Sequence, residues 1–137
     1  MANSIIEGCG VHHIALCSSD FEKSLKFYTE GLGFKIFKQW SNPEKQIALL
    51  DIGDGSYVEL FSNAKPGCSD CTDAGNYIHF AFRVKDSKAA FERALEYGAT
   101  PWIQPKYVEL GAEDPLHVWL SFVKGPDGEQ LEFFQVV

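Results

Sequence analysis

The pattern of hydrophobic and polar positions occurs twice along this chain of 137 residues. The stretch VHHIALCSSD, residues 11–20, alternates as a strand does and then meets polar residues typical of a helix start. The stretch IHFAFRVKD, residues 78–86, repeats it, with a histidine seven residues before an aspartate in both copies. Each copy is followed by a helical stripe and further alternating runs, so the pattern predicts two similar halves, each a strand, a helix and three strands.

The expected elements follow from alternation, helical spacing and turn residues. Ser18 or Ser19 is expected to cap the first helix, and Gly31 and Gly33 to stop it. Pro101 and Pro105 should place their strand at a sheet edge. The first half contains strands 11–17, 34–40, 46–52 and 56–61 and a helix over 21–29; the second contains strands 77–84, 100–104, 117–123 and 129–136, a helix over 86–97 and an acidic loop over 106–115.

The length indicates one domain with a sizeable core. We expect a single domain over 1–137, with a first module at about 10–62, a linker at about 63–76 and a second module at about 77–137. The linker carries Cys68 and Cys71, which we interpret as two loop thiols because one such pair cannot complete a tetrahedral thiolate site.

Charge and hydropathy exclude some classes of binding partner. The formal net charge of −7 and the pI near 5.0 argue against nucleic acid or an anionic membrane as partner. No apolar run approaches a membrane span, and residues 1–10 lack the basic and apolar stretches of a secretory signal. The expected location is therefore the cytoplasm, with reduced cysteines.

Two histidines and two glutamates occupy corresponding places in the two halves: His13, Glu59, His79 and Glu132. If each sheet curls and the concave faces meet, these side chains converge. Two imidazoles and two carboxylates suit a divalent ion and leave room for a substrate. Taken singly, each histidine could be an interior hydrogen-bonding residue and each glutamate a solvent-facing one. The repeat favours the metal, because burying such groups without a partner is costly.

Other polar and aromatic residues are weaker candidates. His12 should point to the face opposite His13, and His117 could reach a substrate but suits a surface role better. Trp40, Trp102 and Trp119 are candidates for pocket walls, with core or rim packing as the alternative.

The chain resembles the vicinal oxygen chelate superfamily, which includes glyoxalase I, methylmalonyl-CoA epimerase, extradiol dioxygenases, and fosfomycin and bleomycin resistance proteins. The resemblance runs from about Gly10 to Val137 and rests on HHIALCSSDFEKSLKFYTEGLGF, YVELF, IHFAFRVKD and GPDGEQLEFF. It implies an α+β fold in which two βαβββ modules form an open, mostly antiparallel, barrel-like sheet around a metal site. The family's four ligand positions fall on His13, Glu59, His79 and Glu132.

With all four ligands present, the pattern is most similar to glyoxalase I. The resemblance then implies a divalent metal, Ni²⁺ or Zn²⁺ first, with Co²⁺, Mn²⁺ or Fe²⁺ as alternatives. It implies a lyase or isomerase that moves a proton between neighbouring carbons of a hemithioacetal-type substrate through a metal-bound enediolate. Glu132 maps to the base and Glu59 to its counterpart. An epimerase, an Fe²⁺ dioxygenase and a small-molecule-sequestering resistance protein remain as alternatives.

Two features bear on the substrate and the assembly. Glyoxalase I enzymes generally carry an arginine at the position of Cys17, whereas here the arginine is Arg83, at the equivalent position of the second half. We expect Arg83 to bind an anionic group with the roles of the halves exchanged, and Asn63 matches a family asparagine at the glutathione site. Many family members of this length are homodimers that share sites between chains, so a homodimer is expected.

Overall fold

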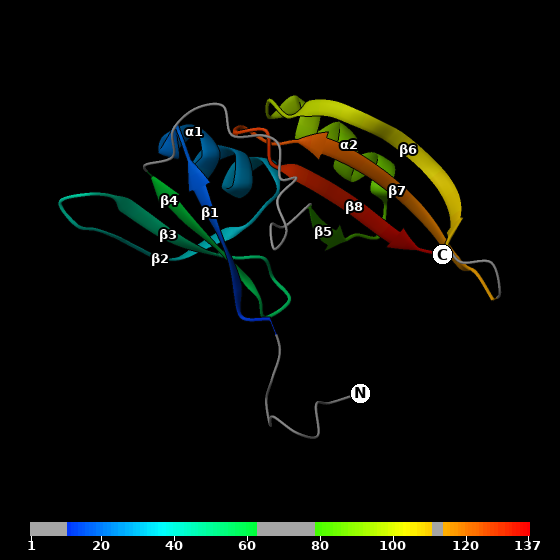
Figure 1. The fold of residues 1–137 in the computed structure, drawn as a ribbon, viewed down its shortest axis with the longest axis horizontal. Coiled ribbons are helices and arrows are strands. Elements are labelled where there is room, and N and C mark those ends of the chain that lie inside the picture. The colour runs from blue at the N-terminus through cyan, green and yellow to red at the C-terminus, as the bar shows by residue number, and fades with distance from the viewer. Residues whose placement is uncertain (1–10, 63–78, 111–113) are drawn as a thin grey trace, which may run out of the picture.

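The computed structural model describes residues 11–62, 79–110 and 114–137, and within them two modules of the same design (Figure 1). The predictions made for Asn63, Cys68 and Cys71 concern residues outside these ranges. The first module contains β1 (His13–Ser18), α1 (Phe21–Lys26), a π-helical turn η1 (Phe27–Gly31), β2 (Lys35–Ser41), β3 (Gln46–Asp51) and β4 (Tyr57–Ser62). The second contains β5 (Phe80–Arg83), α2 (Ser87–Glu96), β6 (Thr100–Leu110), β7 (Leu116–Lys124) and β8 (Gln130–Val136).

Each module forms its own four-stranded mixed sheet. The strand orders are β1-β4-β3-β2 and β5-β8-β7-β6, and in each sheet only the first strand is parallel to its neighbour. The predicted α+β class with two βαβββ modules is confirmed, and both sheets are open, so the described strands close no barrel. No described helix is long and apolar enough to cross a membrane.

The strand β6 differs from the prediction. The sequence placed a loop over 106–115, but the strand continues to Leu110 and pairs with β7 along its whole length. Its register shifts between Pro101 and Ile103 and again between Ile103 and Lys106. A proline has no N–H to donate, and the strand bulges around these positions and resumes pairing afterwards. The predicted edge position of this strand is confirmed.

The aspartates of the repeated motif cap the two helices. Asp20 accepts a hydrogen bond from Lys23 N at 3.1 Å, and Asp86 accepts one from Ala89 N at 2.9 Å. The prediction that Ser18 or Ser19 caps the first helix was wrong, because Ser18 Oγ instead accepts from the backbone N–H of Asp20 at 3.2 Å. In both modules, the aspartate seven residues after the histidine therefore marks the start of the next helix.

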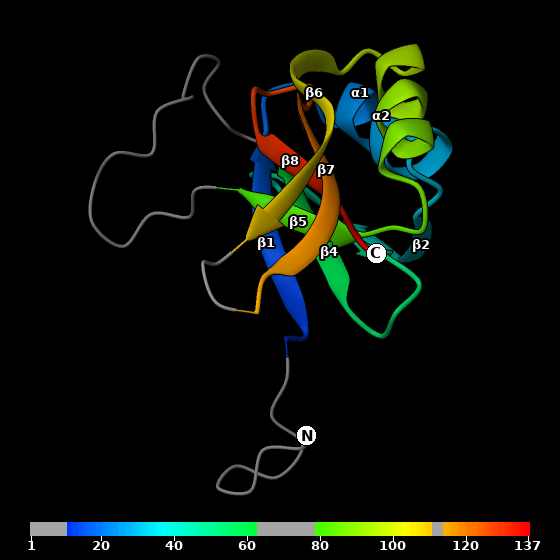
Figure 2. The same cartoon turned by 90° about the vertical axis from the view of Figure 1, so that its right-hand side faces the viewer.

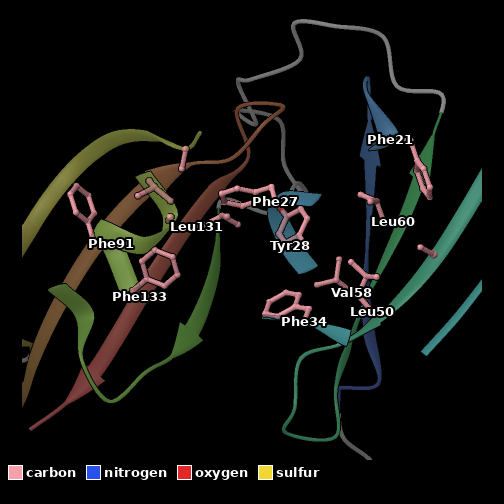
Figure 3. Packing of buried hydrophobic residues seen from close by; sticks show 14 residues of the cluster. Phe21, Phe27, Tyr28, Phe34, Leu50, Val58, Leu60, Phe91, Leu131 and Phe133 are labelled. Carbon is pink, nitrogen blue, oxygen red and sulfur yellow. The ribbon is translucent and has the colours of Figure 1, made fainter. Parts of the chain in front are cut away.

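One hydrophobic core joins both modules. Phe27 and Tyr28 of η1 and Phe34 after it lie between the sheets and belong to one cluster with Phe91 of α2 and Phe133 of β8 (Figure 3). Gly31 allows η1 to approach α2, since a Cβ there would lie 2.9 Å from Tyr97 Cβ. The two helices consequently lie on the same side of the molecule, and the strands extend on the other (Figure 2).

The turn between β7 and β8 attaches the second module to the first by hydrogen bonds. Asp127 accepts from Ser19 N at 3.0 Å and from Ser24 Oγ at 3.2 Å, and Glu129 accepts from Tyr28 OH at 2.6 Å. Partial burial opposes ionisation of Asp127, but the serine hydrogen bonds outweigh it and hold its pKa below the usual value. Burial raises the pKa of Glu129, although the hydrogen bond from Tyr28 acts the other way.

We predict that Asp127→Ala lowers the free energy of unfolding by about 1–2 kcal/mol at pH 7, because three donors of the first module lose a charged acceptor. A group with a lowered folded-state pKa stabilises the fold above its unfolded pKa and loses that contribution as the pH falls. The difference between variant and wild type should therefore shrink below about pH 4. Urea unfolding measures it, and Glu22→Ala in the exposed part of α1 is the control. Equal stability of the two variants would contradict the assignment.

Candidate metal centre

The first histidine–glutamate pair lies across β1 and β4. His13 Nε2 is 3.1 Å from Glu59 Oε2. The parallel register pairs Ala15 with Glu59, so the carboxylate lies two residues along from the histidine, on the same face of the sheet. Strand alternation places both side chains on this face, as the sequence predicted.

The second pair repeats this geometry in β8 and at the residue before β5. His79 Nε2 is 3.0 Å from Glu132 Oε2, and the register pairs Ala81 with Glu132. In both modules the glutamate is opposite the residue two positions after the histidine. The two modules therefore share the same strand register and the same histidine–glutamate contact.

Both pairs lie on the sheet faces that the helices do not cover. In β4 the residues that alternate with Glu59 are the buried Val58 and Leu60, which belong to the core between the modules. In β8, Leu131 and Phe133 face the core in the same way. The opposite face of the first sheet leaves large apolar side chains exposed, among them Phe37 at 64% and Trp40 at 38%.

The two glutamates differ in their surroundings. The side chain of Glu132 is only 8% exposed, against 19% for Glu59. Burial raises the pKa of Glu132, and the neighbouring His79 partly offsets this. A carboxyl group with a raised pKa accepts a proton more readily at neutral pH, which is the property needed for proton transfer.

Aromatic and imidazole side chains hold the histidines in place. His12 Nδ1 is 2.9 Å from His13 Nδ1, and the His12 ring stacks on Tyr57 at 5.1 Å. The prediction that His12 points away from His13 was therefore wrong, because His12 lies before the start of β1 and its ring contacts that of His13 at 5.2 Å. In the second module Phe122, directly opposite Glu132, packs edge-on against His79 at 5.2 Å.

Strand alternation does not identify His12 as a neighbour of His13. Phe122 could have been found from the alternation of strand 117–123, but its pairing with Glu132 depends on a register that the sequence does not specify.

The two pairs are not joined into one site within the chain. Among the described residues, no group of three or more His, Cys, Asp or Glu side chains is close enough to hold one metal ion. The four side chains were expected to meet at one point, but within the described chain they form two separate pairs. The reason is that the core side of each sheet, not the histidine side, faces the other module.

The remaining candidates fall on both sides of the sheets. Trp102 packs against Phe122 at 5.5 Å and so borders the Glu132 face, as Trp40 borders the Glu59 face. Trp119 pairs with Gln135, which bonds to α2, so it lies on the opposite face and is no wall of this site. His117 lies on that face too and contacts Tyr107 and Glu109, away from Glu132.

Arg83 ends β5 on the His79 side of the strand and is 82% exposed. Its guanidinium lies 4.0 Å from Asp54 in the hairpin between β3 and β4. At about 3.3 Å per residue, its backbone is about 13 Å along the strand from His79. Arg83 therefore lies at the far end of β5 from His79.

The fold, the duplicated pairs and the sequence agree with one family. Residues 10–133 match the model of the Glyoxalase/Bleomycin resistance protein/Dioxygenase superfamily. The chain belongs to this superfamily. This confirms the resemblance on which the sequence expectations rested.

Within the superfamily, the chain is 31% identical to the lactoylglutathione lyase of Neisseria meningitidis over 129 residues, covering 90% of this chain and 88% of that one. A crystal structure of SMU.1112c superposes with a TM-score of 0.77 at 26% identity, covering 93% and 99% of the two chains. The trypanothione-dependent glyoxalase I of Leishmania major gives a TM-score of 0.66 at 26% identity, covering 93% and 87%.

We predict that Glu132→Gln stabilises the metal-free protein at pH 8 by about 1 kcal/mol, because it removes a desolvated charge. A carboxyl group whose folded-state pKa is raised costs stability as the pH rises past its unfolded value, so the gain should vanish below about pH 4. Urea unfolding in the presence of EDTA measures the effect, with Glu22→Gln as the exposed control. A less stable Glu132→Gln variant at pH 8 would contradict the predicted cost of this buried carboxylate.

Proposed function

We propose that this protein is a metal-dependent lyase of the lactoylglutathione lyase type, which isomerises a hemithioacetal-type adduct of a small carbonyl compound. The observation that carries the proposal is the duplicated pair geometry, with Nε2–Oε2 distances of 3.1 and 3.0 Å at equivalent registers. Lactoylglutathione lyases are among the similar proteins, at about the same length.

The donor chemistry of the pairs fits a divalent ion. An imidazole nitrogen and a carboxylate oxygen, aimed at each other on an open sheet face, make half of an N₂O₂ set, and the second pair supplies the other half. We propose His13, Glu59, His79 and Glu132 as the ligands and Ni²⁺ or Zn²⁺ as the metal. When bound, the ion would act as a Lewis acid that stabilises negative charge developing on the substrate.

Glu132 is the residue we propose as the base. Its buried carboxylate would take the proton from the carbon next to the carbonyl and return it to the neighbouring carbon, so that no net proton is lost. Glu59, less buried and on the other module, would be the counterpart on the other side of the substrate. Trp40, Trp102 and Phe122 would exclude water from the site.

The residues say less about which thiol forms the hemithioacetal with the carbonyl compound. Cys17 occupies the position where glyoxalase I enzymes carry an arginine, and it is exposed on the His13 face. Arg83 and Asn63 are the residues we propose for an anionic group of the substrate. The similar Leishmania major enzyme is described as trypanothione-dependent, which supports testing thiols other than glutathione.

We further propose a homodimer in which each site takes one pair from each chain. Each chain leaves a pair and large apolar side chains uncovered on the same sheet faces, such as Phe37 at 64% and Trp102 at 46%. Such apolar surface is typical of a protein–protein interface. Within each chain, we propose that the two modules act as one domain with a cytoplasmic location.

The first test combines metal analysis with an assay. Protein purified without chelator should contain nickel or zinc and should convert the methylglyoxal–glutathione adduct, and dialysis against chelator should abolish turnover until metal is returned. We expect Glu132→Gln to lower kcat by about 10²–10⁴-fold, as expected for loss of a general base. Glu44→Gln, in the exposed turn after β2, is the matched control. Turnover by fully metal-free protein would contradict the proposal.

The second test addresses the shared site. His13→Ala and His79→Ala homodimers should both be inactive, yet mixing them under subunit exchange should restore about a quarter of wild-type activity, since each mixed dimer contains one intact site. Sites confined to single chains would regain nothing on mixing. Chromatography of each variant confirms that both remain dimers.

A further inference from the structure

A cavity of about 220 Å³ lies between the two modules, separate from the histidine–glutamate pairs. We call it the seam pocket. The first module contributes the end of η1, Phe34 and Ile52, and the second contributes β5, α2 and β8. The lining residues are Gly31, Leu32, Phe34, Ile52, Phe82, Arg83, Val84, Ala90, Arg93 and Phe133.

The sheet register separates this pocket from the candidate metal centre. Phe82 pairs with Phe133, whereas the adjacent pair Ala81–Glu132 points to the opposite face. The pocket therefore lies on the helix side of β5 and β8. A second chain covering the histidine side of the sheets would leave it accessible.

The pocket wall is aromatic. The rings of Phe34 and Phe82 meet edge-to-face at 5.5 Å, and those of Phe82 and Phe133 lie 6.3 Å apart. The small Ala90 of α2 leaves the space beside them open. Well-packed interiors contain few voids larger than a water molecule, and apolar walls give water no hydrogen bonds. An apolar cavity of roughly 150 Å³ can bind benzene, so this one has room for a substituted ring.

The charged residues of the lining are both arginines, although the chain carries a net charge of −7. Arg93 is engaged, because it donates to the carbonyls of Gly31 and Glu30 and stacks on Tyr97. Arg83 leaves the end of β5 on the face opposite Phe82, so it borders the pocket only from the rim. Its side chain is 82% exposed, and among the described residues its guanidinium lies 4.0 Å from the half-exposed Asp54, in the hairpin that follows the lining residue Ile52. Such exposed pairs are weak, so an anion can recruit this guanidinium.

We propose that the seam pocket binds a small aromatic monocarboxylate, with its ring among Phe34, Phe82 and Phe133 and its carboxylate at Arg83. The ligand bridges both modules. Its binding should raise the melting temperature of the protein, because it binds the folded state alone.

The test is titration of the full chain with phenylacetate and its neutral analogue phenylacetamide, followed by calorimetry, without metal-centre substrate. We expect a Kd for phenylacetate of about 0.1–3 mM, within the range for so small a ligand. Ala90→Leu should weaken binding at least about tenfold by filling the space. Ala89→Leu, the same change one residue earlier at an exposed position of α2, should leave the affinity unchanged.

The charge contact is tested separately. Arg83→Gln should weaken phenylacetate binding about three- to tenfold and leave phenylacetamide unaffected, whereas Lys88→Gln, which removes a cation outside the pocket, should change neither. Arg83→Gln changes an exposed side chain, so it remains informative should Ala90→Leu fail to fold. The proposal is overturned if 10 mM phenylacetate does not bind, if Ala90→Leu binds as Ala89→Leu does, or if the wild type binds phenylacetamide equally well. Arg83 is also a residue proposed for the substrate's anionic group, but Ala90 and Phe82 are not. The titrations contain no substrate and measure binding alone, so the comparison of Ala90→Leu with Ala89→Leu is independent of the proposed lyase activity.

Discussion

The packing of η1 between the two sheets is the contact on which the rest of the structure depends. Phe27 and Tyr28 are almost fully buried there and join the core residues of both modules into one cluster. Each sheet has only two faces, and this core uses one face of each. The histidine–glutamate pairs are consequently left on the other faces, and the same apolar contact that joins the modules keeps their pairs from sharing an ion within the described part of one chain.

The repeated aspartate and the repeated histidine belong to this same design. Each aspartate fixes the start of a helix, and the strand before it then presents its histidine on the opposite side of the sheet from that helix. The parallel register between the first and last strand of each module adds the glutamate two residues along. The four proposed ligands thus follow from strand alternation, helix capping and register, which place an equivalent histidine–glutamate pair in each half.

Alternation and turn residues were enough to predict both modules, the edge position of β6 and the face on which each of the four site residues lies. They did not predict the features that depend on contacts between residues far apart in the sequence. The sequence could not show that β6 passes its two prolines and continues to Leu110, because pairing with β7 compensates for the missing donors. It could not show that the four side chains form two pairs, because that depends on how η1 and α2 pack. Nor could it show that Trp119 lies on the sheet face opposite Glu132, since a shift of one residue in the strand register moves a side chain to the other face.

The two halves have diverged most where they meet different surroundings. Glu132 is more buried than Glu59. A buried carboxylate with one imidazole partner lowers the stability of the fold, and a residue with a purely structural role has no reason to carry that cost. The equivalent positions four residues after each histidine hold Cys17 and Arg83. The cysteine lies on a face with apolar neighbours, whereas the arginine reaches the seam between the modules and the hairpin that carries Asp54. The duplicated scaffold therefore keeps the four proposed donors in matched places, while the strand ends beyond them carry different side chains in different surroundings.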